Sequence, residues 1–211
     1  MTSSPQPRWF TDTQPGHSQW FIERFRTLES EGHDLLGEAR FADMLAARES
    51  RILDAGCGTG RMAEALHRAG HVAFGVDVDP ELIEAAETDH PGPSYSVVDL
   101  SELTLDDLDG EPMDLVVCAG NVMVFVAPDT ELQVLERLCS VTKPGGRVVV
   151  GFRREPSYPF ERYDADLATL ESRGIARVEH RFSSWHLDPF DEGSDFAVTV
   201  LRRGAADSVV A

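Results

Sequence analysis

From residue 51 onward, strand-like and helix-like segments alternate along the chain. The strand-like segments are short apolar runs at residues 51–55, 71–78, 95–99, 113–120 and 147–152. Each is followed by a segment whose apolar residues recur at helical spacing, at residues 61–69, 80–87, 101–108, 129–141 and 161–174. Strands that alternate with helices of this length form a parallel sheet covered on both faces. The sequence therefore predicts an α/β fold with a doubly wound, Rossmann-like and mostly parallel sheet.

Turn-forming residues agree with this pattern. Asp79 precedes Pro80, which places a capping carboxylate before a proline at the first helical position. The Lys-Pro-Gly-Gly run at residues 143–146 ends one helix and turns into the next strand. Two long β-like stretches, at 175–187 and 195–203, are joined by a turn-rich segment. They predict an antiparallel hairpin at one edge of the sheet.

The two ends of the chain differ from this core. Residues 1–17 are rich in Pro, Ser, Thr and Gln, and we expect them, like residues 204–211, to be flexible. Between them we expect one domain, residues 18–203, made of a helical cap, a ligand-binding core and a substrate-side segment that includes the edge hairpin. These three parts span residues 18–49, 50–152 and 153–203.

Charge and apolar patterning limit the partners. The formal net charge is −18, and such a surface repels phosphate backbones, so no nucleic-acid partner is expected. No apolar run approaches the roughly 20 residues that span a bilayer, and the first residues lack the layout of a secretion signal. We therefore expect a cytoplasmic protein without a membrane partner. Cys57, Cys118 and Cys139 lack metal-ligand spacing, so no metal site is predicted.

Residues 53–60, Leu-Asp-Ala-Gly-Cys-Gly-Thr-Gly, join the first strand to the first helix of the alternating pattern. A glycine-rich junction at this place is the usual nucleotide pocket, because bare backbone turns tightly and approaches a ligand closely. A plain turn needs one such glycine, and three alternating glycines fit that alternative poorly. The dinucleotide fingerprint asks for Gly or Ala where Arg61 stands, and the Gly-Lys-Ser/Thr end of a P-loop is absent.

The stretch Ile-Leu-Asp-Ala-Gly-Cys-Gly-Thr-Gly, residues 52–60, strongly resembles the first signature of the class I S-adenosylmethionine-dependent methyltransferases. The resemblance continues in order along the chain. GVDVDP ends the second strand with Asp77, VVDLSEL ends the third with Asp99, DLVVCAGNVMVFV covers the fourth strand and its exit, and LCSVTKPGGRVVVGF matches the helix, turn and fifth strand. It covers roughly residues 50–152, about half of the chain.

This resemblance implies S-adenosyl-L-methionine as the cofactor. It places Asp54 near the methionine portion, Val78 and Leu100 as apolar plates on either side of the adenine, and the methyl group near the exit of the fourth strand. The cofactor-binding residues it implies are Asp54, Gly56, Cys57, Gly58, Gly60, Asp77, Val78, Asp99, Leu100 and Ala119.

Two of these acids are also supported by their positions. Asp77 stands 21 residues after Gly56 at a strand's carboxyl end, where a carboxylate can accept both ribose hydroxyls. Its alternative role is to cap the next helix, for which Asp79 is better placed. Asp99 can accept from the adenine amine while the backbone N–H of Leu100 donates to the ring. Its alternative role is a helix cap before Ser101, and the family resemblance decides between the two.

The acceptor side is less defined. Asn121 offers a donor and an acceptor at the exit of the fourth strand and is a candidate catalytic or substrate-binding residue. Relatives that methylate amino groups of nucleic acids or proteins often carry an Asn/Asp-Pro-Pro-aromatic run here, and this chain does not. Met123, like Phe125, can line a substrate pocket or belong to the core. His186 is a candidate base whose alternative is edge packing. Arg153 can bind an acidic substrate or form a surface ion pair.

Residues ahead of the first strand can also reach the site. His17 can close over it. Trp20 and Phe21 can form a lid or pack in the core. Arg40 can reach the cofactor carboxylate or pair with a neighbouring acid on its helix.

These observations favour a methyltransferase that transfers a methyl group to a small molecule by in-line displacement. Such an enzyme needs no Ser/His/Asp or metal constellation, because the cofactor supplies the activated group. One alternative is an NAD(P)-dependent oxidoreductase, which shares the fold but conflicts with Arg61. Another is a non-catalytic module that binds S-adenosylmethionine. The expected partner is a small-molecule substrate, and a monomer or a homodimer is expected.

Overall fold

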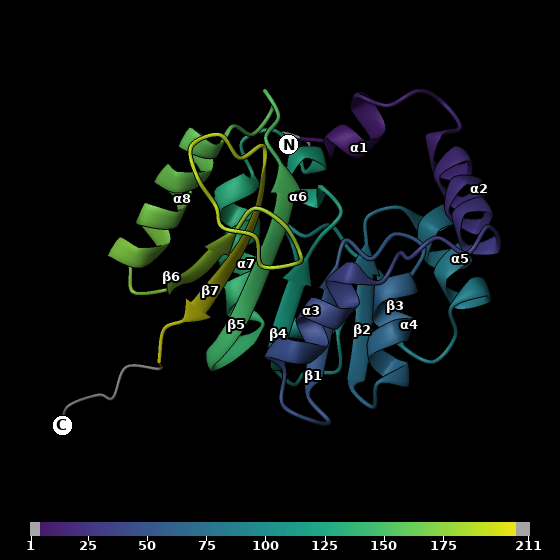
Figure 1. The fold of residues 1–211 in the computed structure, drawn as a ribbon, viewed down its shortest axis with the longest axis horizontal. Coiled ribbons are helices and arrows are strands. Elements are labelled where there is room, and N and C mark those ends of the chain that lie inside the picture. Colours follow the sequence, from purple (N-terminus) through teal and green to yellow (C-terminus); the bar gives the residue numbers. More distant parts are fainter. Residues whose placement is uncertain (1–4, 206–211) are drawn as a thin grey trace.

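The computed structural model describes residues 5–205. Its centre is a sheet of seven strands in the order β3-β2-β1-β4-β5-β7-β6 (Figure 1). The strands are β1 (Arg51–Ala55), β2 (Val72–Asp77), β3 (Ser94–Val97), β4 (Met113–Cys118), β5 (Thr142–Arg153), β6 (Ala176–Phe182) and β7 (Phe196–Arg203). Strands β1 to β5 pair in parallel, and β7 runs antiparallel to both β5 and β6. The predicted fold class and edge hairpin are confirmed.

Helices cover both faces of the sheet. They are α1 (Arg8–Thr11), α2 (His17–Ser30), α3 (Gly37–Leu45), α4 (Arg61–Arg68), α5 (Pro80–Asp89), α6 (Val122–Phe125), α7 (Glu131–Ser140) and α8 (Phe160–Ser172). Neighbouring residues of one strand face opposite layers. In β1, Ile52 packs in the cluster that contains Phe41 of α3, whereas Leu53 packs in the cluster that contains Leu135 of α7. Because both faces are buried, the strands read as continuous apolar runs.

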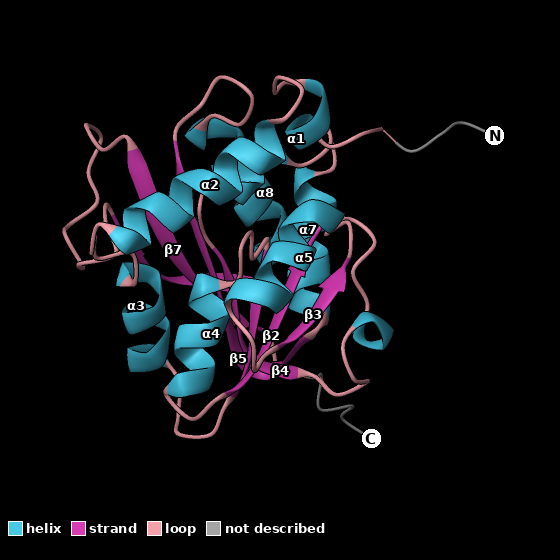
Figure 2. Cartoon of the chain, turned by 90° about the vertical axis from the view of Figure 1, so that its right-hand side faces the viewer, coloured by secondary structure: helices cyan, strands magenta, loops and turns pink. Residues whose placement is uncertain are grey.

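Helices α1 and α2 lie across the carboxyl end of the parallel strands (Figure 2). Helix α2 packs against α5 through Ile22 and Leu82. Helix α2 ends before Gly32, whose φ is 77°, and α3 begins at Gly37. Of the residues predicted to be flexible, 1–17 and 204–211, residues 1–4 and 206–211 lie outside the described residues, and Arg8–Thr11 form α1.

The prediction of a helix at residues 101–108 is wrong. Only Leu105–Asp107 form a single 3₁₀ turn. The Asp99 carboxylate accepts from the backbone N–H of Ser101 at 2.9 Å, and the Asp107 carboxylate accepts from the backbone N–H of Thr104 at 2.8 Å. Short polar side chains thus bind the backbone groups that a longer helix would need.

The Lys-Pro-Gly-Gly run also differs in detail from the prediction. It lies inside β5 as a bulge, since Met113 pairs with Thr142 and Leu115 pairs with Arg147. Gly145, with φ of 73°, takes the left-handed conformation that this bulge requires. The run therefore offsets the pairing of β5 with β4.

Candidate active site

A cavity of about 340 Å³ opens at the carboxyl ends of β1, β2 and β4. Nine of the ten predicted cofactor residues line it, namely Asp54, Gly56, Cys57, Gly58, Asp77, Val78, Asp99, Leu100 and Ala119. Gly60 does not line the cavity, and its carbonyl accepts a hydrogen bond from Tyr95 Oη at 3.2 Å. The glycine loop and the three strand ends therefore come together at one place, as the alternating pattern predicts.

Two glycines of the loop are required where they stand. Gly56 has φ of 84°, and a Cβ there would collide with the Val122 side chain. Gly58 has φ of 53°, and its Cβ would stand 3.3 Å from Cε1 of Phe21, across the cavity. Both glycines thus take a left-handed conformation and let a side chain approach the loop backbone closely, Val122 at Gly56 and the cavity-lining Phe21 at Gly58.

Asp77 holds the glycine loop in place. Its Oδ2 accepts from the backbone N–H of Gly58 at 2.9 Å, and its Oδ1 accepts from the backbone N–H of Asp79 at 3.0 Å. Burial raises the pKa of Asp77 to about 6. Asp79, not Asp77, caps α5, since its Oδ1 accepts from the backbone N–H of Glu81 at 2.9 Å. Asp77 is therefore free of the capping role and faces the cavity.

Asp99 stabilises a turn and lines the cavity. Its Oδ1 accepts from both the backbone N–H and the hydroxyl of Ser101, at 2.9 and 2.8 Å. Because no helix begins at Ser101, the alternative role of a helix cap does not apply. The turn uses one carboxylate oxygen and leaves the residue in the cavity wall.

Asp54 is the most deeply buried acid of the site, with 3% of its surface exposed. Burial raises its pKa to about 8, and the nearby Asp77 charge acts in the same direction, while Arg61 opposes the rise. A carboxyl group in this environment holds its proton at neutral pH. A cationic ligand group placed beside it would favour the charged form.

This raised pKa predicts how stability depends on pH. The folded protein keeps the Asp54 proton up to a pH of about 8, whereas the unfolded chain releases it near the ordinary aspartate pKa of 3.8. Unfolding therefore releases a proton in this window, and rising pH favours the unfolded state. We expect Asp54→Asn to remove this contribution. When the pH rises from about 4 to about 8, the free energy of unfolding should fall by at least about 1 kcal/mol less in the variant than in the parent.

Urea unfolding of the ligand-free protein at several pH values measures this difference. Asp106→Asn, at an exposed acid outside the cavity, is the control and should follow the parent curve. Parallel curves for the parent and Asp54→Asn would contradict the assignment.

The N-terminal strap, residues 7–17, closes the cavity from above. At one end, Arg8 donates to the Val126 carbonyl at 3.1 Å and to Glu131 Oε1 at 2.9 Å. The next residue, Trp9, donates from Nε1 to Asp79 Oδ2 at 2.7 Å, and at the far end the hydroxyl of Ser18, the residue after the strap, donates to the same oxygen. The strap thus links the segment after β4 to the segment after β2, passing over the end of β1.

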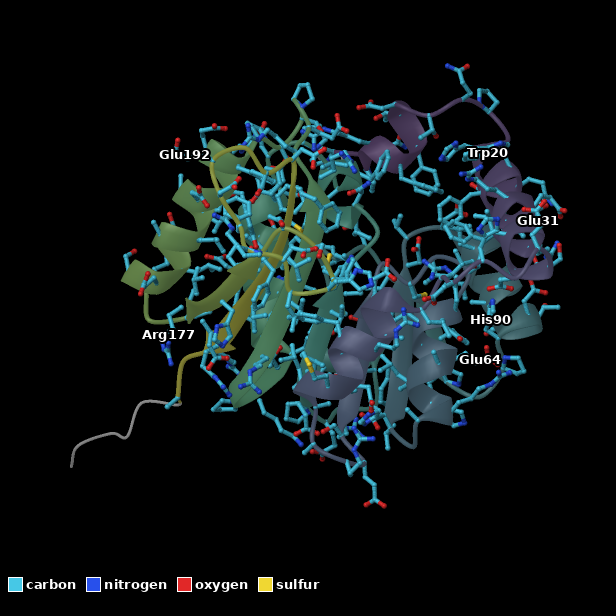
Figure 3. All side chains as sticks on the ribbon, in the orientation of Figure 1. Trp20, Glu31, Glu64, His90, Arg177 and Glu192 are labelled. Carbon is cyan, nitrogen blue, oxygen red and sulfur yellow. The ribbon has the colours of Figure 1, made fainter. Side chains whose placement is uncertain are left out.

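Four aromatic side chains follow one another along this strap and its surroundings, and we call them the aromatic arc: Phe125, Trp9, His17 and Trp20. The ring centroids lie 5.6 Å apart for Phe125 and Trp9, 4.7 Å for Trp9 and His17, and 5.3 Å for His17 and Trp20. All four line the cavity, and Trp20 lies on the part of α2 nearest to α1 (Figure 3). Trp9 was not among the predicted site residues. The only sequence signal is an Arg-Trp-Phe run inside an otherwise polar segment.

The residues predicted to bind the methyl acceptor lie in different environments. Asn121 lines the cavity, and its Oδ1 accepts from the backbone N–H of Arg153 at 2.8 Å. Its φ of 67° is a conformation that asparagine tolerates well. Met123 is fully buried in the core, whereas Phe125 faces the cavity.

Three other candidates lie away from the cavity. The Arg153 side chain pairs with Asp195 on the surface, and His186 is exposed in the loop between β6 and β7. Arg40 pairs with Asp34 at 2.7 Å. The guanidinium that does line the cavity is Arg61, which donates to the Leu35 carbonyl and lies over the Phe25 ring.

Comparison with known proteins agrees with this architecture. Residues 52–146 match the model of a methyltransferase domain family. The chain is 38% identical to a TehB-like SAM-dependent methyltransferase from Corynebacterium glutamicum, whose crystal structure superposes with a TM-score of 0.81 over 90% of this chain and 100% of that one. The chain belongs to the class I S-adenosylmethionine-dependent methyltransferase family.

Curated relatives point to the same family. The chain is 35% identical over 162 residues to the ubiquinone biosynthesis O-methyltransferase of Xanthomonas campestris, and the match covers 74% of this chain and 64% of that protein. The corresponding protein of Xylella fastidiosa is 36% identical over 104 residues, or 48% of this chain and 41% of the relative. The chain therefore spans less than two thirds of the length of these relatives. Among residues 5–205, no helix combines the length and apolar character that a membrane crossing requires.

Proposed function

We propose that the protein transfers a methyl group from S-adenosylmethionine to a small-molecule acceptor inside the cavity. The observation that carries this proposal is the convergence of the bare Gly58 backbone with acids from the ends of three neighbouring strands, Asp54, Asp77 and Asp99. A Cβ at Gly58 would crowd the Phe21 ring, which lines the same cavity. The residues present therefore fit a nucleoside laid across the end of the sheet.

Each part of S-adenosylmethionine has a partner in the cavity wall. Asp77, held by the loop, accepts from the ribose hydroxyls. Val78 and Leu100 flank the adenine, and Asp99 accepts from its exocyclic amine. The buried Asp54 lies beside the methionine ammonium. Ala119 and Asn121, at the exit of β4, mark the side from which the acceptor approaches.

The chemical demands on the chain are then modest. When bound, the cofactor supplies a methyl group already activated on a sulfonium. The protein's residues must orient the acceptor behind that group and exclude water. The strap serves the second task because it covers the cavity between Val126 and Asp79.

The small size of the acceptor is supported by two features. Helices α1 and α2 lie across the carboxyl end of the parallel strands (Figure 2), and side chains from both line the cavity, which limits the room for a macromolecular acceptor. The formal net charge of −18 opposes a nucleic-acid acceptor. The curated relatives named above carry the name O-methyltransferase, which supports oxygen as the methylated atom.

Ligand binding tests this proposal directly. Isothermal titration of the purified chain with S-adenosylmethionine, S-adenosylhomocysteine, NAD⁺ and NADP⁺ should give binding by the first two alone. Tight NAD⁺ binding with no signal from S-adenosylmethionine would overturn the proposal. Catalysis is then tested by incubating the protein with methyl-labelled cofactor and a metabolite extract, where good binding without any methylated product would favour a non-catalytic module.

A further inference from the structure

The aromatic arc has no role in the cofactor contacts proposed above. Those contacts use the glycine loop and the ends of β1, β2 and β3. The arc comes from the strap, from the start of α2 and from Phe125 at the end of α6, the helix that follows β4. It therefore forms part of the same cavity's wall, next to the place from which the methyl group is to leave.

The geometry of the arc suits a flat ring. The Trp9 ring meets Phe125, Phe21 and His17 at steep interplanar angles of 87°, 88° and 67°. When two neighbouring rings stand at a steep angle, a ligand between them meets the face of one ring and the edge of the other. A planar aromatic ligand can stack on the first ring and contact the edge of the second, which a puckered saturated ring cannot do as well.

The polar groups in this part of the wall are few and complementary. Besides the indole N–H groups of Trp9 and Trp20, of which that of Trp9 donates to Asp79, residues 7–21 and 121–126 contribute two polar side chains to the described cavity lining, His17 and Asn121. The Asn121 oxygen is engaged by the Arg153 backbone, so its amide nitrogen is the group available to donate. The His17 ring nitrogens have no hydrogen-bond partner among residues 5–205, and a neutral imidazole can accept a proton. One donor and one acceptor match a hydroxyl group.

Charge argues against an anionic acceptor. Among residues 5–205, the cavity lining contains four acidic side chains, Glu38, Asp54, Asp77 and Asp99, but one guanidinium, that of Arg61. Arg61 is already engaged by the Leu35 carbonyl. The two arginines after β5 face elsewhere, because Arg153 pairs with Asp195 and Arg154 lies over the Phe160 ring.

We propose that the aromatic arc is the acceptor site and that it selects an uncharged, planar aromatic compound carrying a hydroxyl group. This inference rests on the proposed function. His17 accepts the proton of the hydroxyl, and Asn121 donates to its oxygen. In the transfer the carbon–sulfur bond breaks with its electron pair remaining on sulfur, a carbon–oxygen bond forms, and the acceptor's proton passes to His17.

Small probes test the class of acceptor without knowledge of the natural one. The protein is first titrated with S-adenosylhomocysteine, and the saturated complex is then titrated with phenol, cyclohexanol, benzoate and protonated benzylamine, followed by NMR. We expect phenol to bind at least about 10-fold more tightly than each of the other three. Equal or tighter binding of the saturated, the anionic or the cationic probe would overturn the inference.

Two variants test whether phenol binds at the aromatic arc. His17→Phe keeps a ring in place and removes the nitrogens, so it should weaken phenol binding about 3- to 10-fold while leaving toluene binding unchanged. Phe125→Ala should weaken both phenol and toluene. Matched controls are His33→Phe and Phe10→Ala, at exposed residues that do not line the cavity.

The outcomes distinguish failure of the acceptor inference from failure of the proposed function. If S-adenosylhomocysteine binds and phenol shows no preference, or if His17→Phe and Phe125→Ala bind phenol as the parent does, the acceptor inference fails and the proposed function stands. If S-adenosylhomocysteine itself does not bind, the proposed function fails first, and the acceptor inference falls with it.

Discussion

Asp77→Asn is expected to weaken S-adenosylhomocysteine binding about 100-fold, or by about 3 kcal/mol. The variant loses the charged acceptor for the ribose hydroxyls. In the parent, the backbone N–H groups of Gly58 and Asp79 each donate to one oxygen of the Asp77 carboxylate. The asparagine side chain of the variant has an NH₂ group in place of one oxygen, so one of these two hydrogen bonds is lost. Both effects act on the same ligand contact, so the loss should appear in affinity.

Isothermal titration at pH 7.5 measures the change, and thermal unfolding of the ligand-free variant shows whether it still folds. Glu87→Gln is a suitable control, because Glu87 is an exposed acid on α5 outside the cavity lining. A folded Asp77→Asn protein with unchanged affinity would show that the ribose lies elsewhere.

Glu131→Ala is expected to reduce the free energy of unfolding by about 3 kcal/mol, since it leaves the buried Arg8 guanidinium without its ionic partner. The Glu131 side chain is fully buried and accepts from both Arg8 and Arg162, each at 2.9 Å. Arg8 is itself only 11% exposed. Loss of this carboxylate also frees one end of the strap, so the dissociation of S-adenosylhomocysteine should become faster.

Chemical unfolding gives the first quantity, and stopped-flow fluorescence of the strap and α2 tryptophans gives the second. Asp129→Asn is the matched control, because Asp129 pairs with the same Arg162 from a position that is 87% exposed. The control should change neither quantity measurably. A Glu131→Ala variant as stable as its control would contradict the view that the strap is anchored by a buried ion pair.

The parts of this protein that could be predicted from sequence are those governed by local patterns. Apolar runs alternating with helical periodicity define the sheet, and acids that directly follow such runs must lie at its carboxyl edge. Asp54, Asp77 and Asp99 were therefore predictable as neighbours although they are separated along the chain. The same logic placed Asn121 at the cavity.

The parts that could not be predicted depend on contacts between distant residues. Arg153 pairs with Asp195, 42 positions away, and Trp9 bonds to Asp79, 70 positions away. No local pattern indicates such partners. Met123 and Phe125 show the same limit at short range, since both are apolar neighbours on α6 and only packing decides that one is core and the other cavity wall.

The position of the strap bears on how the protein should be handled. Trp9 lines the cavity, and Arg8 donates to Val126, another lining residue, so a tag or carrier joined just ahead of them sits beside the cavity. Strand β7 runs antiparallel to β5 and ends with Arg203 near the amino end of that strand, on the side of the sheet away from the cavity (Figure 1). Immobilisation on a sensor surface through that end keeps the entrance facing solution, and ligand measurements made in this orientation report on the native opening.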